Sequence, residues 1–314
     1  MKIQLKTRKI IFFVSVLTVL ASAAGLSFCY LYSRQIPPTS SQNALTLAEV
    51  SREIPTGVIL WSKKGNIIQS HFKEWHPKVV AKGKNPRWSP DGKKILFTRE
   101  HDTWIMDRNG AQKKLIENTS DIGAYWTRDG SSVTAINRLN PRQVIRYNLK
   151  TQKISIVHDE AKPPFRGYQL EQCAELRSGG RFLLTFTQDD GHRSMVIDLV
   201  KKTYIMNEFM EKGDCNPSWS PDGRFIIMTR RSIMRPIYLA NFLSHHGSVK
   251  ESRYLVGKGR CHNGAVSNNS KYVVYSSSGD IYLWKVDAQP VKYRHGTRLT
   301  FDADQNINPS VFIF

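Results

Sequence analysis

The residues of this 314-residue chain that could carry chemistry recur at one point of an internal repeat. They stand a few positions before a turn that usually ends in Asp-Gly, and they are carboxylates, thiols, an amide and an imidazole: Asp121, Glu171, Gln172, Cys173, Asp214, Cys215, Cys261 and His262. Such groups bind polar ligands, transfer protons or ligate metals. Because a repeat places equivalent positions in equivalent surroundings, we predict that these residues surround one opening of the fold.

The three thiols and the imidazole could together form a metal site. Cys173, Cys215, Cys261 and His262 are ligand types of tetrahedral zinc, which binds thiolate sulfur at about 2.3 Å. The alternative is buried thiols, or one disulfide between neighbouring repeats, which needs a Cα separation below about 7 Å. We favour the alternative, because three separate repeats would have to place four ligands around one ion. The prediction is therefore a protein without a cofactor.

Established catalytic motifs are missing from the chain. It contains no Gly-x-Ser-x-Gly elbow, no His-Glu-x-x-His pair, no phosphate-binding loop and no Cys-x-x-Cys. Asp91, Asp129 and Asp222 each precede a glycine, which indicates turn formers rather than acid catalysts. The sequence favours a noncatalytic protein. The alternative is a metal-dependent polysaccharide lyase or hydrolase that uses His262 and the nearby carboxylates at the mouth of a central channel.

The repeat is clearest in two segments of nearly identical sequence. Residues 85–92 read NPRWSPDG and residues 216–223 read NPSWSPDG, with a third copy at 124–130 and weaker copies at 174–180 and 264–270. A short apolar run rich in β-forming residues follows each turn, and further short runs complete the unit. Pro, Asp and Gly favour tight turns. Each unit is therefore predicted to be a four-stranded antiparallel meander.

The spacing of the turns indicates how many units there are. The five turns end at residues 92, 130, 180, 223 and 270, so they are 38, 50, 43 and 47 residues apart, which is typical of propeller blades. Residues 58–61 and 67–72 are predicted to be the second and third strands of a unit whose first strand is missing. Residues 308–311 are predicted to be a first strand that no second strand follows. We predict that these ends share a sixth blade. The predicted fold class is an all-β, six-bladed β-propeller with four-stranded blades, closed by the C-terminal strand and preceded by one N-terminal hydrophobic helix.

The motif Pro-x-Trp-Ser-Pro-Asp-Gly, followed by an Ile-Leu-Phe strand, resembles the repeat of TolB-like β-propellers. It is also similar to the propellers that precede prolyl-oligopeptidase catalytic domains. The resemblance is strong at 88–97 and 219–228 and weaker around Leu176 and Val266. It implies an exported, mostly noncatalytic propeller of a kind that often binds proteins at the mouth of its central channel.

The N-terminus has the features of a membrane-directed segment. Four basic residues within 1–9 precede the uncharged run 10–33, which as a helix of about 1.5 Å per residue reaches roughly 35 Å, enough to cross a bilayer core of about 30 Å. The alternative is a signal peptide cleaved at residues 21–23 (ASA). We predict a signal-anchor or signal peptide at 1–36, a flexible linker at 37–56 and the propeller at 57–314. Positive-inside orientation then places the propeller on the extracytoplasmic side, periplasmic or extracellular.

The net charge of +20 indicates the class of partner. An extracytoplasmic basic surface suits an envelope protein or an anionic envelope polymer, and we predict that the chain does not bind nucleic acid. A distributed solubilising surface is the alternative explanation of the charge. The predicted function is a membrane-anchored binding or protein-interaction module of the cell envelope. A purely structural envelope protein, with a channel filled by apolar side chains, is a further alternative.

Overall fold

The computed structural model describes residues 46–121, 124–159, 169–177, 181–188, 191–198, 203–205, 214–230, 236–241, 253–257, 261–286 and 296–314. The chain divides into two compact units, Met1–Ser40 and Ser41–Phe314, and the described residues belong to the second. The predicted membrane-directed run at 10–33 lies outside the described residues. Within them, no helix has the length and apolar character needed to span a membrane.

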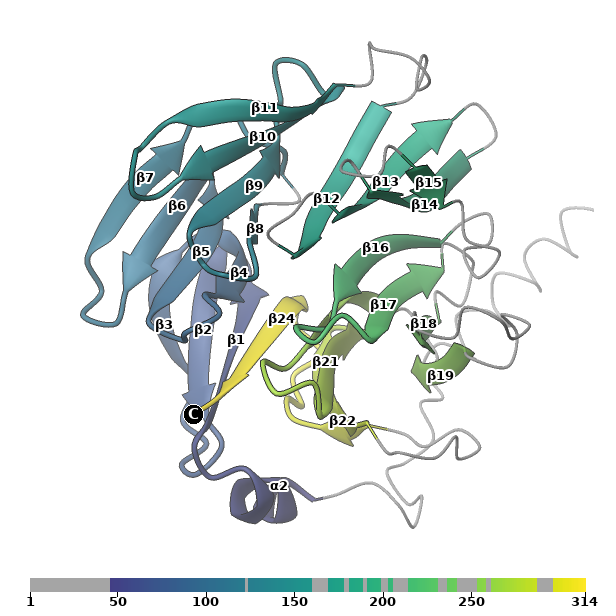
Figure 1. Ribbon diagram of the computed structural model, residues 1–314. Coiled ribbons are helices and arrows are strands. Elements are labelled where there is room, and N and C mark those ends of the chain that lie inside the picture. The colour runs from purple at the N-terminus through teal and green to yellow at the C-terminus, as the bar shows by residue number, and fades with distance from the viewer. Residues whose placement is uncertain are drawn as a thin grey trace, which may run out of the picture. The chain divides into compact units, whose positions relative to one another are not determined.

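The described strands form six four-stranded antiparallel sheets, and five of these consist of four consecutive strands (Figure 1). The first contains β4 (Lys84–Trp88), β5 (Lys94–Arg99), β6 (Asp102–Asp107) and β7 (Gln112–Ile116). The second contains β8 (Tyr125–Trp126), β9 (Ser132–Ile136), β10 (Gln143–Asn148) and β11 (Ile154–Asp159). The third contains β12 (Gln169–Arg177), β13 (Arg181–Gln188), β14 (Gly191–Asp198) and β15 (Thr203–Ile205). The fourth contains β16 (Asp214–Trp219), β17 (Phe225–Arg230), β18 (Ile237–Asn241) and β19 (Arg253–Gly257). The fifth contains β20 (Cys261–Val266), β21 (Tyr272–Ser277), β22 (Asp280–Lys285) and β23 (Thr297–Arg298).

The remaining sheet is assembled from both ends of the described chain. It has the order β24 (Asn306–Ile313), β1 (Gly57–Lys63), β2 (Asn66–His71) and β3 (Lys78–Lys82). The β1–β24 ladder runs antiparallel and places Ile59 opposite Val311 and Val58 opposite Phe312. β24 also lies beside β4 on one side and β20 on the other. The first strands of the sheets therefore surround a common axis, which is the arrangement of a β-propeller (Figure 1).

The predicted fold class is corrected in the number of blades. Blades built from four consecutive strands number five and not six among the described residues, because the chain enters the ring at a second strand and returns only a first strand at its end. The structure also contains a short amphipathic helix that was not predicted, α2 (Leu47–Glu53), in which Val50 is the buried residue. This helix lies within 37–56, the predicted linker.

A capping box explains why α2 forms there. The Thr46 hydroxyl accepts a hydrogen bond from the Glu49 backbone N–H at 3.2 Å, and the Glu49 carboxylate accepts one from the Thr46 backbone N–H at 2.6 Å. These bonds satisfy N–H groups that the first turn of a helix otherwise leaves without partners. A seven-residue helix is marginal in isolation, so its stability depends on packing against the propeller.

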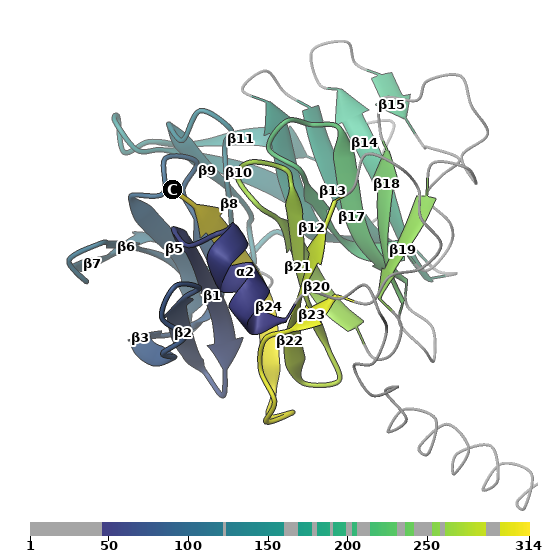
Figure 2. The ribbon, with the colours of Figure 1, turned by 90° about the horizontal axis from the view of Figure 1, so that it is seen from below.

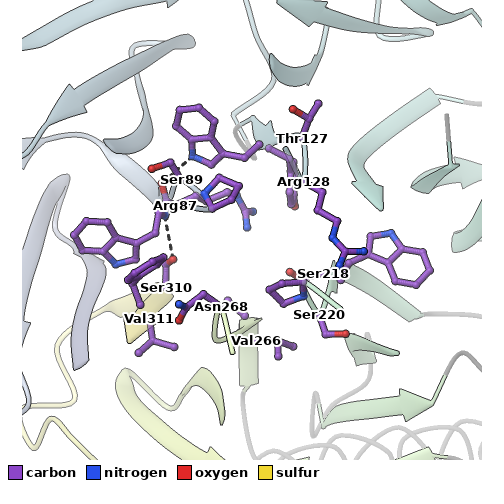
Figure 3. Close-up of a pocket in the computed structure, with 18 residues that line it drawn as sticks. Arg87, Ser89, Thr127, Arg128, Ser218, Ser220, Val266, Asn268, Ser310 and Val311 are labelled. Carbon is purple, nitrogen blue, oxygen red and sulfur yellow. Dashed lines mark hydrogen bonds between the residues drawn. The ribbon is translucent and has the colours of Figure 1, made fainter. Parts of the chain in front are cut away.

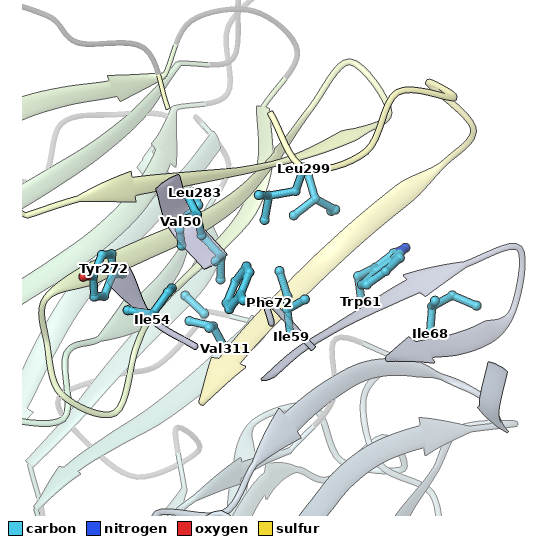
Figure 4. Packing of buried hydrophobic residues seen from close by; sticks show 13 residues of the cluster. Val50, Ile54, Ile59, Trp61, Ile68, Phe72, Tyr272, Leu283, Leu299 and Val311 are labelled. Atoms are coloured by element: carbon cyan, nitrogen blue, oxygen red, sulfur yellow. The ribbon is translucent and has the colours of Figure 1, made fainter. Parts of the chain in front are cut away.

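That packing joins the composite sheet to its neighbour. Val50 and the following Ile54 lie in one buried cluster with Phe72, Tyr272 and Leu283, so α2 contacts residues from both sheets (Figure 4). Figure 2 shows the helix beside β1 and β24. α2 thus covers the place where the two ends of the ring meet.

A polar contact reinforces the same junction. The Tyr272 hydroxyl donates to Glu53 Oε1 at 2.7 Å, and Lys285 Nζ pairs with the same oxygen at 2.5 Å. The hydrogen bond from Lys285 and the one from Tyr272 hold the pKa of Glu53 below its ordinary value. The ionised carboxylate therefore stabilises the docked helix.

The buried ladder between β1 and β24 predicts a large cost for truncating Ile59, which is 0% exposed. Ile59→Ala should lower the free energy of unfolding by about 2–5 kcal/mol, because it removes buried methyl groups and leaves a cavity. The matched control Ile154→Ala, at a position 54% exposed on β11, should change it by less than about 0.5 kcal/mol. Urea unfolding followed by tryptophan fluorescence measures both, and equal losses would contradict this account of ring closure.

The lowered pKa of Glu53 predicts a specific pH dependence. Because the pKa is lower in the folded state than in the unfolded state, the stabilisation is present above the unfolded pKa and is lost as pH falls through the folded pKa. In thermal unfolding, the Tm of the wild type should exceed that of Glu53→Gln at neutral pH. This difference in Tm should disappear in acid. Glu74→Gln, at an exposed side chain, is the control and should show no such convergence. A constant difference between wild type and Glu53→Gln down to pH 3 would disprove the role of the ionised carboxylate.

Candidate functional site

A cavity of about 200 Å³ opens at one end of the central axis, where the first strands lead into the Asp-Gly turns (Figure 3). We call this the turn end, and the opposite end, where the first strands begin, the start end. Residues from β4, β8, β16, β20 and β24 and from the turns that follow line the cavity. The described lining residues are Arg87, Trp88, Ser89, Pro90, Tyr125, Trp126, Thr127, Arg128, Ser218, Trp219, Ser220, Pro221, Ala265, Val266, Asn268, Ser310, Val311 and Phe312.

Side-chain hydrogen bonds hold the rim of this cavity in shape. Ser89 Oγ donates to Asp91 Oδ1 at 2.6 Å, and the same oxygen accepts the Lys93 backbone N–H at 3.0 Å. The bond from Ser89 lowers the pKa of Asp91, so this carboxylate is ionised at neutral pH. Equivalent bonds occur in the turns at 127–132, 220–225 and 267–272. The interpretation of the repeated Asp residues as turn formers is therefore confirmed at Asp91, Asp129 and Asp222.

The repeated tryptophans both join neighbouring sheets and line the cavity. Trp88 packs against Phe312 of the composite sheet, with ring centroids 6.0 Å apart, and Trp126 Nε1 donates to the Arg87 carbonyl of the preceding sheet at 3.2 Å. The cavity was not predicted from the sequence. The signal that could have indicated it is the recurrence of tryptophan at the ends of β4, β8 and β16.

The described lining of the cavity is electropositive. Arg87 and Arg128 line it, and its described lining contains no Asp or Glu. The Arg87 guanidinium carbon lies 3.7 Å from the centroid of the Tyr125 ring. Burial raises the pKa of Tyr125, so its phenol is neutral and does not offset the guanidinium charge. The site can therefore hold a ligand that combines apolar surface with negative charge.

The start end has a different chemistry, because amide side chains bond to each other there. Asn263 Nδ2 donates to Asn308 Oδ1, Asn308 Nδ2 donates to Asn85 Oδ1, and Asn85 Nδ2 donates to the Asp121 carbonyl at 2.6 Å. Asn85 and Asn308 have φ of +54° and +52°, a backbone conformation that asparagine tolerates better than most residues. This chain of bonds connects consecutive sheets of the ring.

The structure describes four of the predicted site residues in detail. Asp121 lies near the start end with its side chain 69% exposed, and its Oδ1 contacts His101 Nδ1. The carbonyl of half-buried His262 accepts the Thr229 hydroxyl at 3.0 Å. Cys173 and Cys261 are both buried. The remaining four, Glu171 and Gln172 on β12 and Asp214 and Cys215 on β16, have strand positions, but their side chains lie outside the described residues.

Cys261 occupies the packing layer between two sheets. It belongs to a buried cluster with Ile237 and Tyr282, and its burial raises the pKa of the thiol to about 12. A protonated thiol is a poor zinc ligand, since the metal binds thiolate. Among the described residues no group of three or more His, Cys, Asp or Glu is placed to hold a metal ion.

Comparison with solved structures identifies the fold. TolB from Acinetobacter baumannii matches with a TM-score of 0.58 and 14% identity, over 81% of this chain and 66% of that chain. The β-propeller domain of Cps50 (Swd1) from Myceliophteria thermophila has a TM-score of 0.49 and 14% identity, over 75% of this chain and 83% of that one. The dihydro-heme d1 dehydrogenase NirN has a TM-score of 0.42 and 13% identity, over 82% of this chain and 56% of that chain.

The likeness to TolB shows a TolB-like β-propeller fold and nothing beyond the fold, because the sequence identity is low. The chain spans slightly less than two thirds of the length of the TolB structure. No protein-family model and no curated protein sequence matches it.

The close approach of Gly92 to the cavity wall predicts the effect of adding one methyl group. Gly92 has φ +67°, and a Cβ there would lie 2.4 Å from Phe312 Cε1, whereas Gly110 has φ +87° with open space around it. Gly110→Ala should cost about 1–2 kcal/mol from backbone strain alone. Gly92→Ala should cost about 1–3 kcal/mol more, because Phe312 must move. Chemical denaturation measures the free energy of unfolding of both variants. Equal losses of this free energy would contradict the prediction, because they would show that the Phe312 ring moves without cost.

Proposed function

We propose that this chain is a noncatalytic binding module of the cell envelope that holds a partner protein at the turn end of its channel. The observation that supports this most directly is the aromatic and basic cavity between the first strands. Clefts with apolar walls and a few polar groups are where proteins bind ligands, and Trp, Tyr and Arg are enriched among residues that contribute most to interfaces.

We further propose that the chain is exported and tethered by residues 1–36, so that the propeller is extracytoplasmic. The basic and apolar pattern of that segment, the resemblance to TolB-like repeats and the net charge of +20 support this proposal. The partner is then an envelope protein, and the residues at the start end, such as Asp121 and His262, remain predictions for a second contact surface.

Filling the turn-end cavity should abolish partner binding without unfolding the chain. Ser218 lines the cavity, and no other residue is described as bonded to its side chain. Ser218→Tyr should reduce partner capture from detergent-solubilised envelopes by at least about tenfold, or roughly 1.4 kcal/mol. Ser155→Tyr, the same change at an exposed position on β11, is the control.

The same experiment should include a chain that lacks residues 1–36. This chain should leave the membrane fraction but keep the affinity for the captured partner, because the tether and the cavity act independently. Unchanged capture by Ser218→Tyr, with a normal thermal unfolding curve, would refute the proposed site. Membrane retention of the truncated chain in the absence of the partner would refute the proposed tether.

A further inference from the structure

Arg87 is the half-buried charged group of the cavity lining, and no hydrogen bond of its guanidinium is described. Its Nε is enclosed by protein, and within the described residues it has no hydrogen-bond partner. Its guanidinium takes part in no described ion pair, and its described contact is with the face of Tyr125. An enclosed donor without an acceptor is costly, most of all when it carries charge. The two terminal nitrogens of the guanidinium are not enclosed and have no described hydrogen bond, so a ligand acceptor in the cavity can reach them.

The surroundings of Arg87 select the type of acceptor. A guanidinium that stacks on an aromatic ring keeps its N–H bonds in its own plane, where a planar carboxylate can accept two of them. The other walls include Val266, Val311 and Phe312, which are apolar. A phosphate dianion would need more donors than one such fork and would be poorly solvated there. A singly charged, planar acceptor with an apolar neighbour fits better.

We propose that the Arg87 guanidinium binds a carboxylate of a polypeptide ligand, an Asp, Glu or C-terminal group that enters the turn-end cavity beside an apolar side chain. This inference rests on the proposed function and adds the chemical class that the cavity recognises. Arg128, exposed at the rim, contributes positive charge that attracts the ligand. A cavity of about 200 Å³ accommodates one side chain of this kind and not a folded domain.

The test uses two probes of equal shape and different charge, phenylacetate and phenylacetamide, titrated into the full chain and followed by ligand-observed NMR. Phenylacetate should bind at least about tenfold more tightly than the amide, and this preference should weaken with salt. Arg87→Gln should remove the preference, and Arg87→Lys should restore only part of it because lysine cannot supply the planar fork. Arg142→Gln, at an exposed turn, is the control and should behave as wild type.

Several results would overturn the inference. These are equal binding of the two probes, an unchanged preference in Arg87→Gln, and competition by inorganic phosphate stronger than by acetate. Thermal unfolding of Arg87→Gln separates binding from folding: loss of stability with an intact preference would assign Arg87 a purely structural role. If Ser218→Tyr abolishes partner capture while Arg87→Gln does not, the binding module stands and the carboxylate assignment fails. If neither variant affects capture, the proposed function fails as well.

Discussion

The structure depends on one pairing, the antiparallel ladder between β1 and β24. Each four-stranded sheet is too small to be stable alone, and a ring with an open seam would expose two unpaired strand edges. The ladder joins residues about 250 positions apart and is fixed inside the sheet by Trp61 Nε1, which donates to Asn306 Oδ1 at 2.8 Å. The same strand carries Val311 and Phe312 to the cavity and Asn308 to the amide chain. Both ends of the channel therefore exist only when the ring is closed.

A fully buried carboxylate prepares the chain for this ladder. Asp280, 0% exposed, accepts the Thr300 hydroxyl and the Ala303 backbone N–H, each at 3.0 Å, and pairs with Arg298. A buried charge is tolerated only when its acceptors are filled, and here every partner lies on the segment that leads into β24. The desolvation of Asp280 thus favours one path of the chain, the path that delivers β24 to β1. α2 then covers the junction from outside.

The sequence repeat predicted much of this architecture but does not determine the direction of each side chain. The Asp-Gly turns and the pairing of the C-terminal strand with β1 followed from recurrence alone. The helix at 47–53 was missed, although Thr46 and Glu49 form the pattern of a capping box. The side chain of Cys261 is buried between two sheets. The register shifts between Cys261 and Gly264, and equivalent bulges interrupt β4 and β16. A bulge turns side chains to a different face, so simple alternation cannot place these residues.

The cavity was not predicted because its size depends on side-chain packing, which the repeat does not specify. Repetition shows that Trp88, Trp126 and Trp219 are equivalent, but the width of the space between them depends on how each ring packs against its neighbour. Several neutral groups elsewhere, such as the Thr98 hydroxyl and Trp104 Nε1, are also enclosed without a described partner. These have a modest cost, whereas the Arg87 guanidinium carries a charge that no described residue pairs with. Sequences violate local consistency mainly at functional sites. Arg87 is such a violation, and it lines the turn-end cavity. This coincidence favours recognition of an anion over a structural role.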